Sequence, residues 1–95
     1  MKYSDITNKI IQAYYEVYNK LGIGFEKNIY INALAIKMKA LDLKVENYKK
    51  KELFFENELI GELVVDMYIQ DCIILKIENK EHLYTIIPTK TYTIE

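Results

Sequence analysis

Residues 58–78 read ELIGELVVDMYIQDCIILKIE, and this stretch decides the fold. Two runs rich in β-branched and aromatic residues, 58–69 and 73–78, flank a short polar segment, which is the pattern of a β-hairpin. In the second run Lys76 and Glu78 are two residues apart, and residues at this spacing on a strand lie on the same face. A lysine and a glutamate on one face of an apolar strand raise the question of whether they form a functional site or a structural pair.

Asp66 lies in the first of these strands among apolar residues, where a lone carboxylate is costly unless it is paired or binds a metal. If the turn is the odd-numbered Gln70-Asp71-Cys72, Asp66 lies opposite Lys76 and joins Lys76 and Glu78 on one face. A two-residue turn would send Asp66 to the other face. Two carboxylates and a lysine can hold Mg²⁺ and stabilise a phosphorane-like charge. They can also form ion pairs at the margin of the sheet, the interpretation that residue types alone favour.

The composition is that of an ordinary globular chain. It has 95 residues, of which 51% are hydrophobic and 28% charged, so we expect one domain over residues 1–95. The formal net charge is -1, which gives no strong field toward nucleic acid or membrane. All 13 basic residues are lysine, and the absence of arginine weighs against sequence-specific reading of DNA.

The compartment is inferred from the single cysteine and the lack of targeting signals. Cys72 has no second cysteine with which to form an internal disulfide, which suits a reducing interior. Polar residues such as Lys9 interrupt any run typical of a signal peptide, and no apolar run is long enough to cross a bilayer. We therefore expect a cytoplasmic location in a bacterial host cell and no membrane partner.

Two helical patterns precede the hairpin. In the first, residues 4–22, Ser4 or Asp5 is expected to cap the start and Gly22 to end the helix. Its apolar stripe is Ile6, Ile10, Tyr14, Val17 and Leu21. In the second, residues 26–41, one line is formed by Ile29, Ala33, Ile36 and Ala40, widened by Tyr30, Leu34 and Leu41. We expect these stripes to face the core.

The rest of the chain has strand patterns. Residues 43–55 predict one strand or a broken pair, Glu56-Asn57-Glu58 a hairpin turn, and Gly61 a bulge. The stretch after Pro88 is either a short edge strand or a loose end. The order predicts an α+β fold, with two N-terminal helices packed on a three- to four-stranded, mainly antiparallel sheet.

Aromatic and basic residues are mixed in the stretch Tyr48-Lys49-Lys50-Lys51, which Phe54 and Phe55 follow. Surfaces that bind nucleic acid often combine stacking rings with lysines that pair with phosphates. The alternative, which we favour, is a solvated strand with lysines that prevent edge-to-edge association.

Four stretches, taken in order, resemble the GxxExxY family, a bacterial group with the PD-(D/E)xK nuclease fold. They are NKIIQAYYEVYNKLGIGF, IYINALAIKMKALDLKVE, ELIGELVVDMYI and CIILKIENKEHL, and the resemblance runs from about Ile6 to Leu83. It implies a core of the PD-(D/E)xK type. The family usually continues with another helix and a strand, so we expect this chain, which stops at Glu95, to be C-terminally truncated.

The resemblance places Asp66 at the metal-binding aspartate, Lys76 at the second metal-binding carboxylate and Glu78 at the lysine. The acid-x-lysine motif is therefore inverted. Glu16 stands at the first-helix glutamate, which often faces the site in such nucleases. Lys27 stands at the glutamate of the motif that names the family, between Gly24 and Tyr30.

The inversion has a physical cost. An ammonium beside a cation at about 4 Å is repelled by on the order of 4 kcal/mol at an effective dielectric near 20. We therefore expect no cofactor, no metal and no catalysis, which makes Asp66, Lys76, Glu78 and Glu16 vestigial. If a metal binds, we expect Asp66 and Glu78 to be its ligands.

The resemblance and the inverted motif together imply a catalytically inactive, nuclease-like binding protein. We expect it to bind a nucleic acid or a nucleic-acid-processing enzyme, as an anti-CRISPR or other anti-defence inhibitor of a phage or mobile element would. The expected binding residues are Tyr48, Lys49, Lys50, Lys51 and Lys27. A homodimer is a further possibility, because a truncated sheet leaves apolar surface uncovered. The alternative function is a small Mg²⁺-dependent nuclease.

Overall fold

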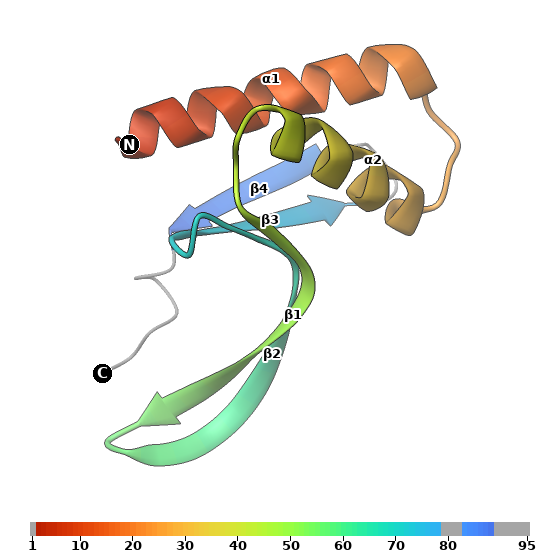
Figure 1. Cartoon of the computed structure of the whole chain (residues 1–95). Coiled ribbons are helices and arrows are strands. Elements are labelled where there is room, and N and C mark those ends of the chain that lie inside the picture. The colour runs from red at the N-terminus through yellow and green to blue at the C-terminus, as the bar shows by residue number, and fades with distance from the viewer. Residues whose placement is uncertain (1, 79–82, 89–95) are drawn as a thin grey trace.

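Two helices pack against a four-stranded antiparallel sheet (Figure 1). The computed structural model describes residues 2–78 and 83–88. In chain order the elements are α1 (Tyr3–Leu21), α2 (Lys27–Ala40), β1 (Val45–Phe55), β2 (Glu58–Ile69), β3 (Ile73–Glu78) and β4 (Leu83–Pro88). The strand order is β1-β2-β3-β4 and each neighbouring pair is antiparallel. The predicted α+β class is confirmed.

The β2–β3 hairpin forms as its sequence predicts. Ile69 pairs with Ile73, so the turn has three residues. Two of them, Gln70 and Asp71, have φ of 54° and 55°, in the left-handed region that short turns require. The odd-numbered turn, on which the expected position of Asp66 depends, is confirmed.

The pairing of β1 with β2 has two irregularities. Tyr48 has a φ of 55°, and the ladder skips the pair that Tyr48 and Asp66 would form. Farther out, Leu53 pairs with Gly61 but the next pair is Phe54 with Leu59. The extra residue is therefore Ile60, one position before the predicted bulge at Gly61.

The outer end of the β1–β2 hairpin is a two-residue turn. Glu56 and Asn57 have φ of 48° and 66°, as a type I′ turn requires, and Glu58 already belongs to β2. Beyond the body of the protein this hairpin continues as a long, curved, two-stranded arm (Figure 1).

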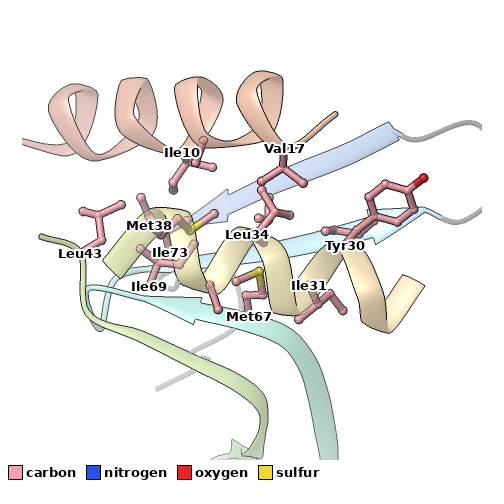
Figure 2. Packing of buried hydrophobic residues seen from close by; sticks show 14 of the residues in the cluster. Ile10, Val17, Tyr30, Ile31, Leu34, Met38, Leu43, Met67, Ile69 and Ile73 are labelled. Atoms are coloured by element: carbon pink, nitrogen blue, oxygen red, sulfur yellow. The ribbon is translucent and has the colours of Figure 1, made fainter. Parts of the chain in front are cut away.

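The main core lies between the helices and the sheet (Figure 2). Helix α1 contributes the predicted residues Ile6, Ile10 and Val17, all buried, and the sheet contributes residues such as Met67 and Ile73. A second, smaller cluster is made by Val65, Tyr68 and Ile74, with Leu63 and Ile87 packed against it.

Helix α2 buries a stripe that coincides only partly with the predicted one, sharing Tyr30 and Leu34. Ile36, on the predicted line, is 73% exposed, and Ile29 is exposed as well. The buried residues are Tyr30, Ile31, Leu34, Ala35 and Met38. Apolar residues occur around most of this helix, so helical spacing fits two lines, and only packing against the sheet decides between them.

The ends of α1 correct one expectation and confirm another. Lys2 is the N-cap of α1 and gives no side-chain cap, so the predicted caps at Ser4 and Asp5 are wrong, whereas Gly22, with a φ of 71°, ends the helix as predicted. The last described strand is β4, which ends at Pro88. The prediction of an edge strand or a loose end after Pro88 falls on residues 89–95, which lie outside the described residues.

Candidate functional site

The site is organised around Asp66, at the point where β2 leaves its neighbours. The ladder between β2 and β3 runs from Ile69 to Met67 and stops there. Beyond that point, Asp66 Oδ2 accepts a hydrogen bond of 2.8 Å from the backbone N–H of Ile77 in β3. The carboxylate thus satisfies a strand N–H at the end of the ladder, where a backbone carbonyl would otherwise be needed.

The second oxygen of Asp66 is held by a lysine from the start of α2. Lys27 Nζ lies 2.9 Å from Asp66 Oδ1, with the two side chains 33% and 12% exposed. A cation at a helix N-terminus is opposed by the helix dipole, so the carboxylate compensates an otherwise unfavourable position. An ammonium therefore stands where this carboxylate would meet a bound cation.

A glycine turn positions Lys27. The hydroxyl of Tyr30 donates a hydrogen bond of 2.6 Å to the carbonyl of Gly22 and accepts one of 3.4 Å from the N–H of Phe25. Gly24 between them has a φ of 108°, a conformation that side chains rarely adopt. The hydroxyl ties the turn to the first turns of α2 and so fixes where the helix starts.

The other predicted site residues do not join Asp66 in an ion pair. Lys76 is exposed, and its neighbours Leu75 and Ile77 belong to the main core, so strand alternation turns it away from the helices. Lys76 and Asp66 both line a hollow of about 60 Å³, but within the described part of the chain no ion pair links them. The backbone of Glu78 ends β3, and its side chain lies outside the described structure.

Glu16 is placed far along the helix layer. It forms an ion pair of 3.2 Å with Lys37, and both side chains are more than a third exposed. Lys37 is ten residues after Lys27 in α2, which is about 15 Å at 1.5 Å per residue. Glu16 therefore belongs to the surface between the helices and not to the surroundings of Asp66.

These residues do not fit a divalent ion. Mg²⁺ prefers several oxygen ligands in octahedral geometry. Both oxygens of Asp66 already have partners, one of them a cation. Among the side chains that the structure describes, which do not include that of Glu78, no group of three histidine, cysteine, aspartate or glutamate residues could hold a metal.

The predicted basic and aromatic surface on β1 is divided between two faces. Lys49 and Lys51 lie over the ring of Tyr68, at 4.8 and 5.1 Å from its centroid. Lys49 also bonds Glu46 at 2.9 Å, and this hydrogen bond raises the pKa of Lys49. Lys50, between them, is exposed on the other face. Tyr48 is exposed at the bend.

Sequence reasoning missed the contacts of two residues in this region. Lys27, which the sequence analysis names only as a binding residue, pairs with Asp66. The available signal was a strand carboxylate among apolar residues, which needs a partner. Tyr68 was not singled out, because only the hairpin register brings its ring under the two lysines.

Comparison with known families gives the class of this protein. A model of the PD-(D/E)XK nuclease superfamily matches residues 4–90, which is most of the chain. The chain belongs to this superfamily, and its two helices and antiparallel sheet are consistent with that fold. Searches of curated proteins and of solved structures gave no match.

Described residues include no helix with the length and apolar character needed to cross a bilayer.

Proposed function

We propose that this chain is a non-cleaving member of the nuclease superfamily that acts by binding. Its expected targets are a nucleic acid or an enzyme that processes nucleic acid. The observation that carries the proposal is the ion pair of Lys27 with Asp66, in which a fixed ammonium lies 2.9 Å from the strand carboxylate.

Electrostatics support loss of the metal. Bringing a divalent ion to Asp66 would require the Lys27 ammonium to leave, or would bring two positive groups close together at a repulsion of several kcal/mol. Lys76, at the position where the resemblance places a second acidic ligand, adds another positive charge. A protein of this class that cannot hold Mg²⁺ has lost the ion that would stabilise charge during phosphodiester cleavage.

The form of binding follows from the lysines. Without arginine, contact with nucleic acid would rest on phosphate pairing, which is sequence-independent and weakens with salt. We further propose that the chain belongs to the GxxExxY group and modulates a nucleic-acid-processing complex. An anti-CRISPR or other anti-defence inhibitor carried by a phage or mobile element is the concrete case.

The first test measures metal binding and cleavage. The wild-type protein should show no rise in melting temperature with Mg²⁺ or Mn²⁺, and no more cleavage of DNA or RNA than Asp66→Asn. The triple change Lys27→Glu, Lys76→Glu and Glu78→Lys restores the family's charges and should produce a Mn²⁺-dependent rise. Lys39→Glu makes the same net change of charge elsewhere and should not.

Mg²⁺-dependent cleavage by the wild-type protein that disappears in Asp66→Asn would establish the nuclease alternative instead.

A second experiment measures binding, with fluorescent single- and double-stranded oligonucleotides at several salt concentrations. Replacing Lys49, Lys50 and Lys51 by Gln should weaken binding and flatten its salt dependence by roughly one unit of slope per lost phosphate contact. Lys2, Lys39 and Lys44, which are all exposed, are replaced by Gln together as the matched control.

A further inference from the structure

The outer end of the β1–β2 hairpin is an acidic and apolar surface, which we call the hairpin tip (residues 52–62). It contains no lysine and four glutamates, which are Glu52, Glu56, Glu58 and Glu62. All four are exposed, and within the described chain none of them forms an ion pair. Phe55, Leu59 and Ile60 are each at least half exposed beside them. The tip is thus an apolar contact surface surrounded by uncompensated negative charge.

A second apolar surface lies between the helices, and we call it the helix groove. Its volume is about 390 Å³. Its apolar part is Val17, Leu21, Ala33, Ile36 and Ala40, and its charged rim is Glu16, Lys20 and Lys37. Glu16 and Lys37 form an ion pair with each other, while Lys20 is exposed and has no ion pair among the described residues. The groove is therefore apolar, and Lys20 leaves its rim with one unpaired positive charge that can face a glutamate of the hairpin tip.

The two surfaces of one molecule are too far apart to meet. The tip and the helices lie at opposite ends of the molecule in Figure 1, which is 45 Å in its longest dimension. From Asn47 to Glu56 the arm extends by roughly 30 Å at about 3.3 Å per residue. An arm of this length can reach past its own body to a neighbouring molecule.

We propose that the hairpin tip of one copy docks in the helix groove of a second copy, and that the contact is reciprocal in a two-fold dimer. Apolar side chains of the tip cover Ile36 and Leu21, and a glutamate of the tip faces Lys20. Exposed apolar area of this kind is usually a contact site, and a two-fold dimer uses both surfaces of each chain. The proposal is independent of the proposed binding function.

The alternative way for two sheets to meet is disfavoured by the lysines. Strand β1 is an edge of the sheet. Pairing β1 with β1 of another copy around Lys50 would place Lys49 opposite Lys51, and like charges in opposed positions are destabilising. Charge thus opposes edge pairing while it favours contact between tip and groove.

Self-association tests the proposal, measured by analytical ultracentrifugation from about 1 µM to about 500 µM, a range suited to a contact of modest area. We expect a dimer. Leu59→Asp in the tip and Ile36→Asp in the groove should each weaken it by about tenfold or more. Val64→Asp and Ile23→Asp, at comparably exposed positions outside both surfaces, should leave it unchanged. Circular dichroism verifies that each variant is folded.

Mixing the two defective variants separates this contact from others. The Leu59→Asp chain keeps an intact groove and the Ile36→Asp chain an intact tip, so an equimolar mixture should recover a heterodimer with one of the two contacts. Charge reversal gives a second test. Glu58→Lys and Lys20→Glu should each weaken the dimer, and the two changes combined in one chain should restore part of the dimer affinity.

Four outcomes would overturn the contact between tip and groove, and a fifth would overturn the closed dimer. The four are a monomer over the whole range, normal dimerisation of Leu59→Asp, normal dimerisation of Ile36→Asp, and no heterodimer in the mixture. Normal dimerisation of the tip variant would assign the interface to the groove alone, and that of the groove variant to the tip alone. Growth into larger assemblies would contradict the closed two-fold arrangement.

Discussion

The two ends of strand β2 have similar apolar residues but differ in burial. Met67 and Ile69, at one end, are completely buried, whereas Leu59, Ile60 and Val64, at the other, are more than half exposed. The first end is covered by α2 and β3, and the second extends into the arm (Figure 1). The apolar and β-branched residues therefore make this segment a strand along its whole length. The elements packed against each end decide whether the side chains there are buried and stabilise the fold.

The energetic contrast between the ends is large. Burial of a Val, Leu, Ile or Met side chain contributes about 1.5–3 kcal/mol, and side chains that stay in water contribute little. The inner end thus stabilises the fold, and the outermost residues, Leu59 and Ile60, are free to contribute to association instead. Asp66 lies at the boundary, where the ladder between β2 and β3 stops.

The largest expected effect on the free energy of unfolding comes from a substitution at the buried end of β2. Met67→Ala removes a side chain with no exposed surface and should lower the free energy of unfolding by about 2–4 kcal/mol, through lost burial and a cavity. Val64→Ala, three residues earlier and 57% exposed, should change it by less than about 0.5 kcal/mol. Urea unfolding measures both. Equal losses would show that the arm is buried in solution.

An intermediate effect is expected at the boundary. Lys27→Ala leaves one oxygen of a largely buried carboxylate unpaired and should destabilise the protein by about 1–2 kcal/mol. Lys37→Ala breaks an ion pair whose members are both more than a third exposed, and should cost less than about 0.5 kcal/mol. Thermal unfolding of both variants at low and high salt tests this. If Lys27→Ala is no more costly than Lys37→Ala, Asp66 does not depend on its ammonium.

The smallest effect concerns the exposed end. Asn57 has a φ of 66° in the two-residue turn, so Asn57→Gly fits the backbone with less strain and should stabilise the hairpin by a few tenths of a kcal/mol. The gain should appear as slower amide hydrogen exchange in the arm, with exchange around Ile69 unchanged. Val64→Gly, an exposed strand position, is the control and should loosen the arm instead.

Local patterns predicted β2 and β3 well because the turn between them carries its own signal, whereas β4 was not predicted. The bounds of β2 and β3, the three-residue turn and the end of α1 at Gly22 all follow from residues close in the sequence. The buried stripe of α2 did not, since an apolar helix has several plausible faces and the sheet selects one. The side that becomes free, with Ile36, forms part of the helix groove.

The sequence alone determined the class of fold, the order of the first five elements and the two-residue spacing of Lys76 and Glu78 on β3, because these depend on residue type and short spacing. Only the tertiary structure decided which cation accompanies Asp66. Lys27 is 39 residues earlier in the chain, and it reaches the carboxylate because the turn fixed by Tyr30 starts α2 beside the end of the β2–β3 ladder. Proximity between distant segments is a property of packing, and no local pattern contains it.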